Sequence, residues 1–164
     1  MNKGNAKTYP LVFKRDLPHI QREGRTYFVT FSTHERWNLP ESARALVLEH
    51  CLKDHRSRMM LHAAVVMPDH VHLLFTPLCD PEGKSYSLSE ILGGLKGSSA
   101  HSINKLMNRK GKAWQGESFD HILRSSEAIK EKAEYICNNP VRKGLVASIE
   151  DYPWLWREWV EGQL

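Results

Sequence analysis

The sequence predicts one α+β domain, a ferredoxin-like antiparallel sheet with helices packed mainly on one face. Strand-like and helix-like segments follow one another in the order β-α-β-β-α-β-α. Two of the strand-like segments are joined by a short Pro-Asp turn, which is typical of a hairpin and therefore of antiparallel pairing. The 164 residues, of which 41% are apolar, are enough to bury one core.

The first half of the predicted domain consists of a strand, a helix and a hairpin. Residues 27–33 are β-branched and aromatic and alternate as in a half-buried strand. Pro40 suits a first helical position, and apolar residues recur at helical spacing from there to about Arg58. Residues 60–66 and 70–75 are the two strands of the predicted hairpin.

The second half is predicted to contain two helices separated by one strand. Ser87 and Glu90 have the spacing of a capping box, which predicts a helix from there to about Asn108. Residues 114–123 have the aromatic and β-branched character of a last strand. Residues 126–140 are predicted to be a third helix, which Pro140 ends.

Composition indicates a single soluble domain in a reducing compartment. Residues 1–24 are polar and broken by prolines, which predicts an N-terminal arm that lies on the domain or moves freely, whereas residues 25–164 form the domain. There is no apolar run of 18 residues and no apolar leader, so no membrane association is expected. The three cysteines lack C-x-x-C spacing, which argues against a disulfide framework or a thiolate zinc site. We therefore expect a cytoplasmic protein.

His70 and His72 are the centre of the functional argument. Residues i and i+2 of a strand point to the same face, so the two imidazoles are presented together while Val71 points into the core. Such a pair can hold a divalent cation if a third ligand comes from elsewhere. The spacing alone also fits two polar residues on the face of a sheet.

Tyr135 and Asn139 are four residues apart on the third predicted helix, about 40° from each other around its axis. Helical arithmetic places Tyr135 at the edge of the buried stripe, where its phenol can project into a cleft between helix and sheet. Asn139 would offer a carbonyl oxygen toward the same point. The alternatives are an interfacial tyrosine with a solvated hydroxyl and an asparagine that marks a helix end before proline.

Four runs of the sequence have a family likeness when they are taken together. They are, in order, Met67-Pro68-Asp69-His70-Val71-His72-Leu73-Leu74-Phe75, Trp114-Gln115, Asp120-His121-Ile122-Leu123-Arg124, and residues 135–146 from Tyr135 to Val146. With these runs the sequence resembles the REP-associated tyrosine transposases, which belong to the single-tyrosine branch of the HUH endonucleases. The resemblance implies that the histidine pair binds Mg²⁺ or Mn²⁺, that the helix tyrosine is the nucleophile and that the amide four residues later completes the metal site. These roles fall on His70, His72, Tyr135 and Asn139.

The function that this resemblance implies is that of a DNA transposase, a metal-dependent endonuclease and strand transferase. It would cleave and rejoin single-stranded DNA at hairpin or palindromic repeat ends through a covalent 5′-phosphotyrosine, as a monomer or a homodimer. One alternative is a non-catalytic module on the same fold that binds single-stranded nucleic-acid hairpins. A second is a metal-dependent hydrolase in which water attacks in place of Tyr135, with no covalent product.

DNA binding requires cations, and the net charge of +4 conceals a local basic surface. Residues 96–112 contain no acidic residue. The cations predicted to bind nucleic acid there are Lys96, Lys105, Arg109, Lys110 and Lys112, and Arg124, Arg142 and Lys143 would extend this surface toward Tyr135. The alternative is an ordinary solvated charged face.

Four further features have two interpretations each. Lys132, one turn before Tyr135, would favour ionisation of the phenol, whereas His121 is a second acid–base candidate; either can be merely a polar surface residue. Trp114 would stack on a base or lie in the core. The glycines at 93, 94 and 97 would admit a phosphate backbone or allow close helix packing.

Overall fold

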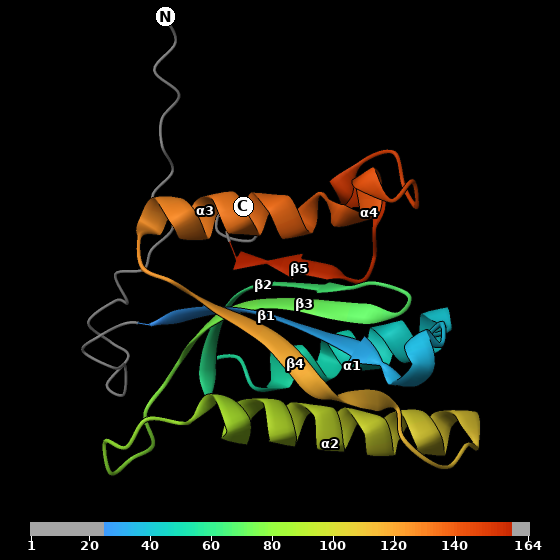
Figure 1. The fold of residues 1–164 in the computed structure, drawn as a ribbon, viewed down its shortest axis with the longest axis horizontal. Coiled ribbons are helices and arrows are strands. Elements are labelled where there is room, and N and C mark those ends of the chain that lie inside the picture. Colours follow the sequence, from blue (N-terminus) through green and yellow to red (C-terminus); the bar gives the residue numbers. More distant parts are fainter. Residues whose placement is uncertain (1–24, 159–164) are drawn as a thin grey trace, which may run out of the picture.

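Five strands form one antiparallel sheet with the order β4-β1-β3-β2-β5 in the computed structural model (Figure 1). The structure describes residues 25–158. The elements in chain order are β1 (Thr26–Thr33), the 3-10 turn η1 (His34–Arg36), α1 (Glu41–Lys53), β2 (Met59–Val66), β3 (His70–Pro77), α2 (Leu88–Met107), β4 (Trp114–Leu123), α3 (Ser126–Cys137), α4 (Asn139–Arg142), the 3-10 turn η2 (Ile149–Asp151) and β5 (Leu155–Arg157).

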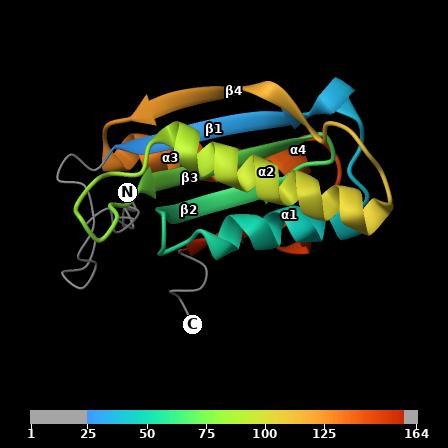
Figure 2. The same ribbon diagram turned by 90° about the horizontal axis from the view of Figure 1, so that it is seen from below.

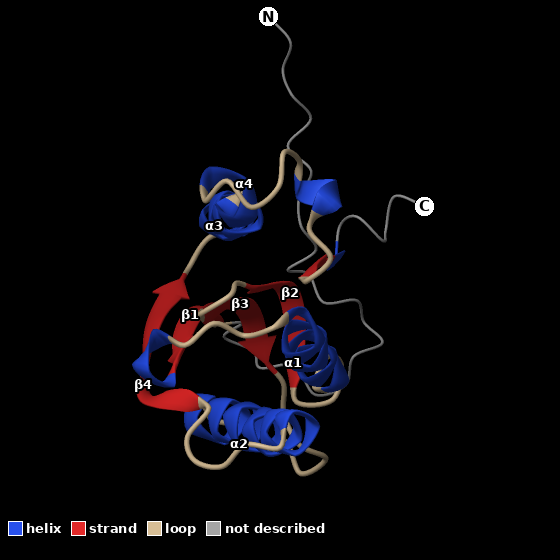
Figure 3. Ribbon diagram, turned by 90° about the vertical axis from the view of Figure 1, so that its right-hand side faces the viewer, coloured by secondary structure: helices blue, strands red, loops and turns tan. Residues whose placement is uncertain are grey.

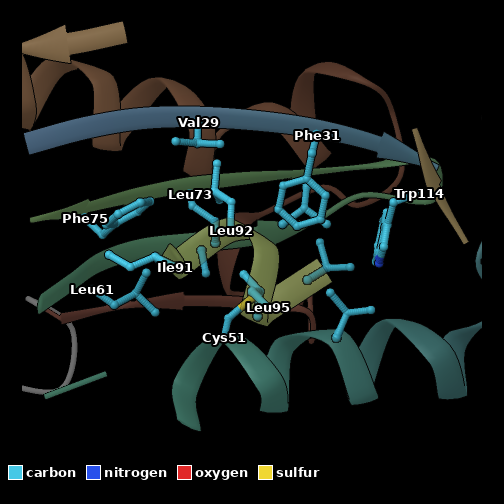
Figure 4. Packing of buried hydrophobic residues seen from close by; sticks show 14 of the residues in the cluster. Val29, Phe31, Cys51, Leu61, Leu73, Phe75, Ile91, Leu92, Leu95 and Trp114 are labelled. Atoms are coloured by element: carbon cyan, nitrogen blue, oxygen red, sulfur yellow. The ribbon is translucent and has the colours of Figure 1, made fainter. Parts of the chain in front are cut away.

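The α+β, ferredoxin-like prediction is confirmed, because β1 and β3 lie in the middle of the sheet and α1 and α2 cover one face (Figure 2). Inward residues of β1 and β3 interlock there with those of the two helices (Figure 4). Ser87 and Glu90 cap α2 reciprocally, and Asn108 ends it with a left-handed φ of 48°. The predicted bounds of this helix are therefore correct.

Helix α3 lies on the opposite face of the sheet from α1 and α2 (Figure 3). Its buried stripe of Ile129, Ala133 and Ile136 packs in a second core with Phe28 and Leu74. The central strand β3 is consequently buried on both faces. Two of the three long helices share one face, and the third covers the side on which the candidate site is built.

The ends of two helices differ from the sequence predictions. Helix α1 ends at Lys53, before Arg58, because the chain turns back at once into β2 through hydrogen bonds to the Asp54 carbonyl. Pro140 does not close α3, which ends at Cys137; proline is tolerated in a first helical turn, and here it lies in α4.

The short edge strand β5 was not predicted. Three residues, 155–157, are too few to show a periodic pattern, and pairing with β2 defines them. Tyr152 fixes the approach to β5 by donating its hydroxyl proton to the Val66 carbonyl at 2.6 Å. The predicted arm, residues 1–24, lies outside the described residues, within which no helix has the length and apolar character to cross a membrane.

Candidate active site

His70 and His72 open the central strand β3 and point toward the α3 side of the sheet. Val71 between them is fully buried in the opposite core, beneath α1 and α2. The two imidazole rings are 4.7 Å apart between centroids. The prediction that the pair shares one face and sends Val71 into the core is therefore confirmed by geometry.

The two imidazoles are held by hydrogen bonds on their Nδ1 atoms. His70 Nδ1 donates to Asp69 Oδ1 at 2.7 Å, and His72 Nδ1 is 2.8 Å from Thr30 Oγ1. Arg36 holds the other Asp69 oxygen at 3.0 Å. These bonds leave both Nε2 atoms directed at one point, which is the usual arrangement of metal-ligating histidines and their supporting residues.

That common point is occupied by the side-chain amide of Asn139. Its Nδ2 lies 3.4 Å from His70 Nε2 and 3.1 Å from His72 Nε2, while its Oδ1 accepts a hydrogen bond of 3.1 Å from Arg142. Asn139 is buried even though it lies in the short helix α4. The structure thus brings together the three residues predicted to be metal ligands.

The donor set fits a divalent cation held by two imidazoles and an amide. Burial, with smaller contributions from the positive charges of His70, Arg142 and Lys132, lowers the pKa of His72 to about 3. This ring is therefore neutral, as a metal ligand must be. A half-turn of the Asn139 amide would exchange its nitrogen for its oxygen. Among residues 25–158 no cluster of three His, Cys, Asp or Glu offers another such site.

Tyr135 lies on α3, on the same side of the sheet as the histidine pair, and its side chain is 54% exposed. The Arg142 guanidinium is 4.0 Å from the ring centroid, and the Lys132 ammonium is 5.1 Å from it. The same ammonium is 4.7 Å from the centroid of Phe28, whose ring stacks on His72 at 5.6 Å. One chain therefore places the Tyr135 ring beside the candidate ligands, with two cations against it.

Sequence reasoning missed the residues that support this site. The sequence pattern indicates only a turn at Asp69, although its position next to His70 is a usable signal. Thr30 is 42 residues from His72 and is brought to it only by the β1–β3 register. Arg142 was predicted to bind DNA, but it also donates to the Tyr135 carbonyl at 2.7 Å and to Asn139.

The structure divides the predicted DNA-binding cations between the two sides of the sheet. Arg124 precedes α3, and Arg142 and Lys143 lie at the end of α4, on the side of Tyr135. Lys96, Lys105, Arg109, Lys110 and Lys112 belong to α2 or follow it, on the other side (Figure 1). Two of these are engaged internally: Lys96 donates to the Gln115 carbonyl, and Arg109 lies over the Trp37 ring.

The remaining candidates separate into core and surface. Trp114 is buried, with its edge against Phe31 and its indole N–H bonded to Ser99, so its core interpretation is the correct one. Gly93 and Gly97 border an open groove of about 590 Å³ between α2 and β4, and neither is in close packing. His121 is exposed on β4, directly opposite Phe28.

Fold and site together define a small α+β protein with an exposed tyrosine beside a pair of histidines and an amide. A family model described as "Transposase IS200 like" matches residues 25–139. The chain belongs to this IS200-like transposase family, which confirms the resemblance noted in its sequence.

The chain is also similar to REP-associated tyrosine transposases. A REP-associated tyrosine transposase of Escherichia coli (strain K12) is 29% identical over 133 residues, which cover 80% of this chain and 75% of that protein. A solved structure of a REP-associated tyrosine transposase bound to a REP hairpin superposes with a TM-score of 0.65 at 25% identity. That match covers 81% of this chain and 76% of the other.

Proposed function

We propose that this protein cleaves and rejoins single-stranded DNA at hairpin-forming repeat ends through a covalent 5′-phosphotyrosine at Tyr135. One observation carries the proposal: His70, His72 and Asn139 converge on one point beside Tyr135 within a single chain. A hairpin-binding relative supports the choice of DNA. Because one chain supplies all four groups, we infer that Tyr135 acts within its own subunit.

The chemistry follows from where the groups lie. The Tyr135 hydroxyl oxygen attacks phosphorus and its proton passes to solvent. The bond between phosphorus and the 3′ oxygen breaks, and the leaving 3′ oxygen takes up a proton from solvent to become a hydroxyl. Lys132 stabilises the developing phenolate. His70, His72 and Asn139 would hold Mg²⁺ or Mn²⁺, which supplies positive charge at the scissile phosphate. Attack by a 3′-hydroxyl on the phosphotyrosine reverses these changes and joins two strands.

Cations on the α3 side would hold the DNA backbone at this site. Arg124 and Lys143 are exposed on that side. Lys105, Lys110 and Lys112 would form a second, separate basic surface near the end of α2, which a hairpin held at the active site does not need to reach. The three cysteines are free thiols, which suits the cytoplasmic setting in which we place this activity.

A denaturing gel with end-labelled hairpin oligonucleotides tests the proposal. With Mg²⁺ or Mn²⁺ the protein should become covalently attached to the 5′ phosphate of the fragment downstream of the cut, and Tyr135→Phe should abolish the attachment. Tyr86→Phe is the matched control, because this half-buried tyrosine lies next to α2 on the other side of the sheet. An adduct that persists in Tyr135→Phe would contradict the assignment of Tyr135 as the nucleophile.

The two rival functions predict different gels. A hydrolase that uses water would cut the DNA in Tyr135→Phe as well as in the wild type, with no adduct in either. A module that only binds hairpins would retard the labelled DNA on a native gel and leave it intact on the denaturing one.

A further inference from the structure

Phe119 is the most exposed of the large apolar side chains among residues 25–158, at 61%. It lies in the middle of β4, which is an edge strand of the sheet. A large apolar side chain on an open edge strand favours unwanted association, so a protein normally places a charged or small residue there. Its exposure therefore indicates a binding role for this ring.

The strand register places Phe119 in the row of the candidate active site. Thr30 of β1 pairs with His72 on one side and with Phe119 on the other. The three residues thus follow one another across β3, β1 and β4 and point to the same side of the sheet. With neighbouring strands about 4.8 Å apart, the backbones of Phe119 and His72 are separated by about 10 Å.

Contacts between rings connect Phe119 to the site. Phe28 meets Phe119 edge to face at 6.2 Å and stacks on His72 at 5.6 Å. Phe28 is buried, whereas the Phe119 ring that it contacts is largely exposed. Helix α3 packs over β2 and β3, and His121, next to Phe119 on the same side of β4, is exposed. The outer face of the Phe119 ring is therefore open beside the catalytic groups.

We propose that Phe119 is a stacking platform for an unpaired base of the DNA strand that enters the active site. Stacked nucleotides rise about 3.4 Å each, so a span of about 10 Å corresponds to at most about three nucleotides from the scissile phosphate. An aromatic face accepts any base, and such contacts hold single strands in other nucleic-acid-binding proteins. The inference rests on the proposed function and assigns it a subsite for single-stranded DNA.

Fluorescence of 2-aminopurine tests this subsite in EDTA, where no cleavage occurs. Two hairpins are compared: one with a single-stranded flank that carries the probe within three nucleotides of the expected cut, and one without a flank. Phe119→Ala should weaken binding of the flanked hairpin by about 5- to 150-fold, in line with the known cost of losing a stacked base. The substitution should also abolish quenching of the probe, and it should change the affinity for the flankless hairpin by less than twofold.

Two variants complete the experiment. Phe119→Tyr keeps an aromatic face and should restore binding. Leu106→Ala removes a side chain of comparable exposure, 52%, from α2 on the other side of the sheet, and should change neither hairpin. Thermal unfolding and sedimentation establish that the variants fold and keep the oligomeric state of the wild type.

Several results would overturn the inference. Phe119→Ala could bind the flanked hairpin as tightly as the wild type does, or it could lose equal affinity for both hairpins. It could also change the oligomeric state, which would make this face a contact between protein chains. Failure of the wild type to bind either hairpin removes the inference together with the proposed function. If the wild type quenches the probe but forms no adduct, and Phe119→Ala abolishes the quenching, the subsite is supported and only the proposed cleavage is contradicted.

Discussion

The two sides of the sheet show how one scaffold separates stability from chemistry. On the side of α1 and α2, neighbouring strands present buried apolar residues such as Phe31, Leu73 and Val71. On the side of α3, the same strands present Thr30, His70 and His72, which make polar contacts to their neighbours. Because alternate residues of a strand point to opposite sides, β1 and β3 serve both purposes within a few residues.

The comparison explains why a polar site can lie so close to the centre of a small domain. Burying imidazoles and an amide is costly unless they are hydrogen-bonded, and here each is. In the described part of the chain, no buried side-chain nitrogen or oxygen lacks a hydrogen-bond partner. The core beneath α1 and α2 supplies the rigidity, and the bonded network holds the geometry.

Substitutions of two adjacent residues on β3 should give the largest difference between the two sides of the sheet. His70→Ala removes a candidate ligand and should lower the cleavage rate by at least about a hundredfold, as loss of one charge-stabilising group does in other enzymes. Hairpin binding in EDTA should persist. Val71→Ala, one residue on, should cost about 2 kcal/mol of unfolding free energy and leave cleavage by the folded fraction intact. Equal loss of cleavage in both variants would show that the strand acts as one structural unit.

The support for His70 should have a smaller, measurable effect. Asp69→Asn keeps the size of the side chain but weakens its hydrogen bond to His70 Nδ1, and loss of such partners typically costs about 10- to 100-fold in metal affinity. Titration with Mn²⁺, followed by electron paramagnetic resonance, measures this directly. Asp80→Asn, in the loop after β3, is the control and should bind Mn²⁺ as the wild type does. Unchanged affinity in Asp69→Asn would exclude the supporting role.

The lowered pKa of His72 predicts how stability depends on pH in the absence of metal. Its pKa is about 3 in the folded protein and 6.5 in the unfolded chain, so between these values only the unfolded chain takes up the proton. Stability should therefore fall as the pH falls below 6.5, by about 1–2 kcal/mol at pH 5 from this residue. Urea unfolding in EDTA measures the change. His72→Gln should flatten the dependence, and an identical slope in this variant would contradict the assignment.

Much of the site could be predicted from the sequence because its residues come in local patterns. The i, i+2 spacing of His70 and His72 and the i, i+4 spacing of Tyr135 and Asn139 each have a meaning within one element. Contacts between elements have no such pattern. Thr30 reaches His72 only through the strand register, and Phe119 lies near the site only because β4 pairs with β1. The side of the sheet that α3 covers likewise follows from packing, not from periodicity.

The basic residues give the smallest expected difference between the two sides of the sheet. The sequence predicts one continuous basic surface, whereas the structure divides these cations between the two sides. Lys132 lies on α3 beside Phe28, whereas Lys105 lies on α2 across the sheet. A lysine that neutralises one phosphate adds about 0.7–0.9 to the slope of log affinity against log salt concentration. Lys132→Ala should lower the slope for hairpin binding by about this amount, and Lys105→Ala should leave it unchanged. Equal reductions would mean that the DNA follows both sides of the sheet, since each lysine then contacts a phosphate.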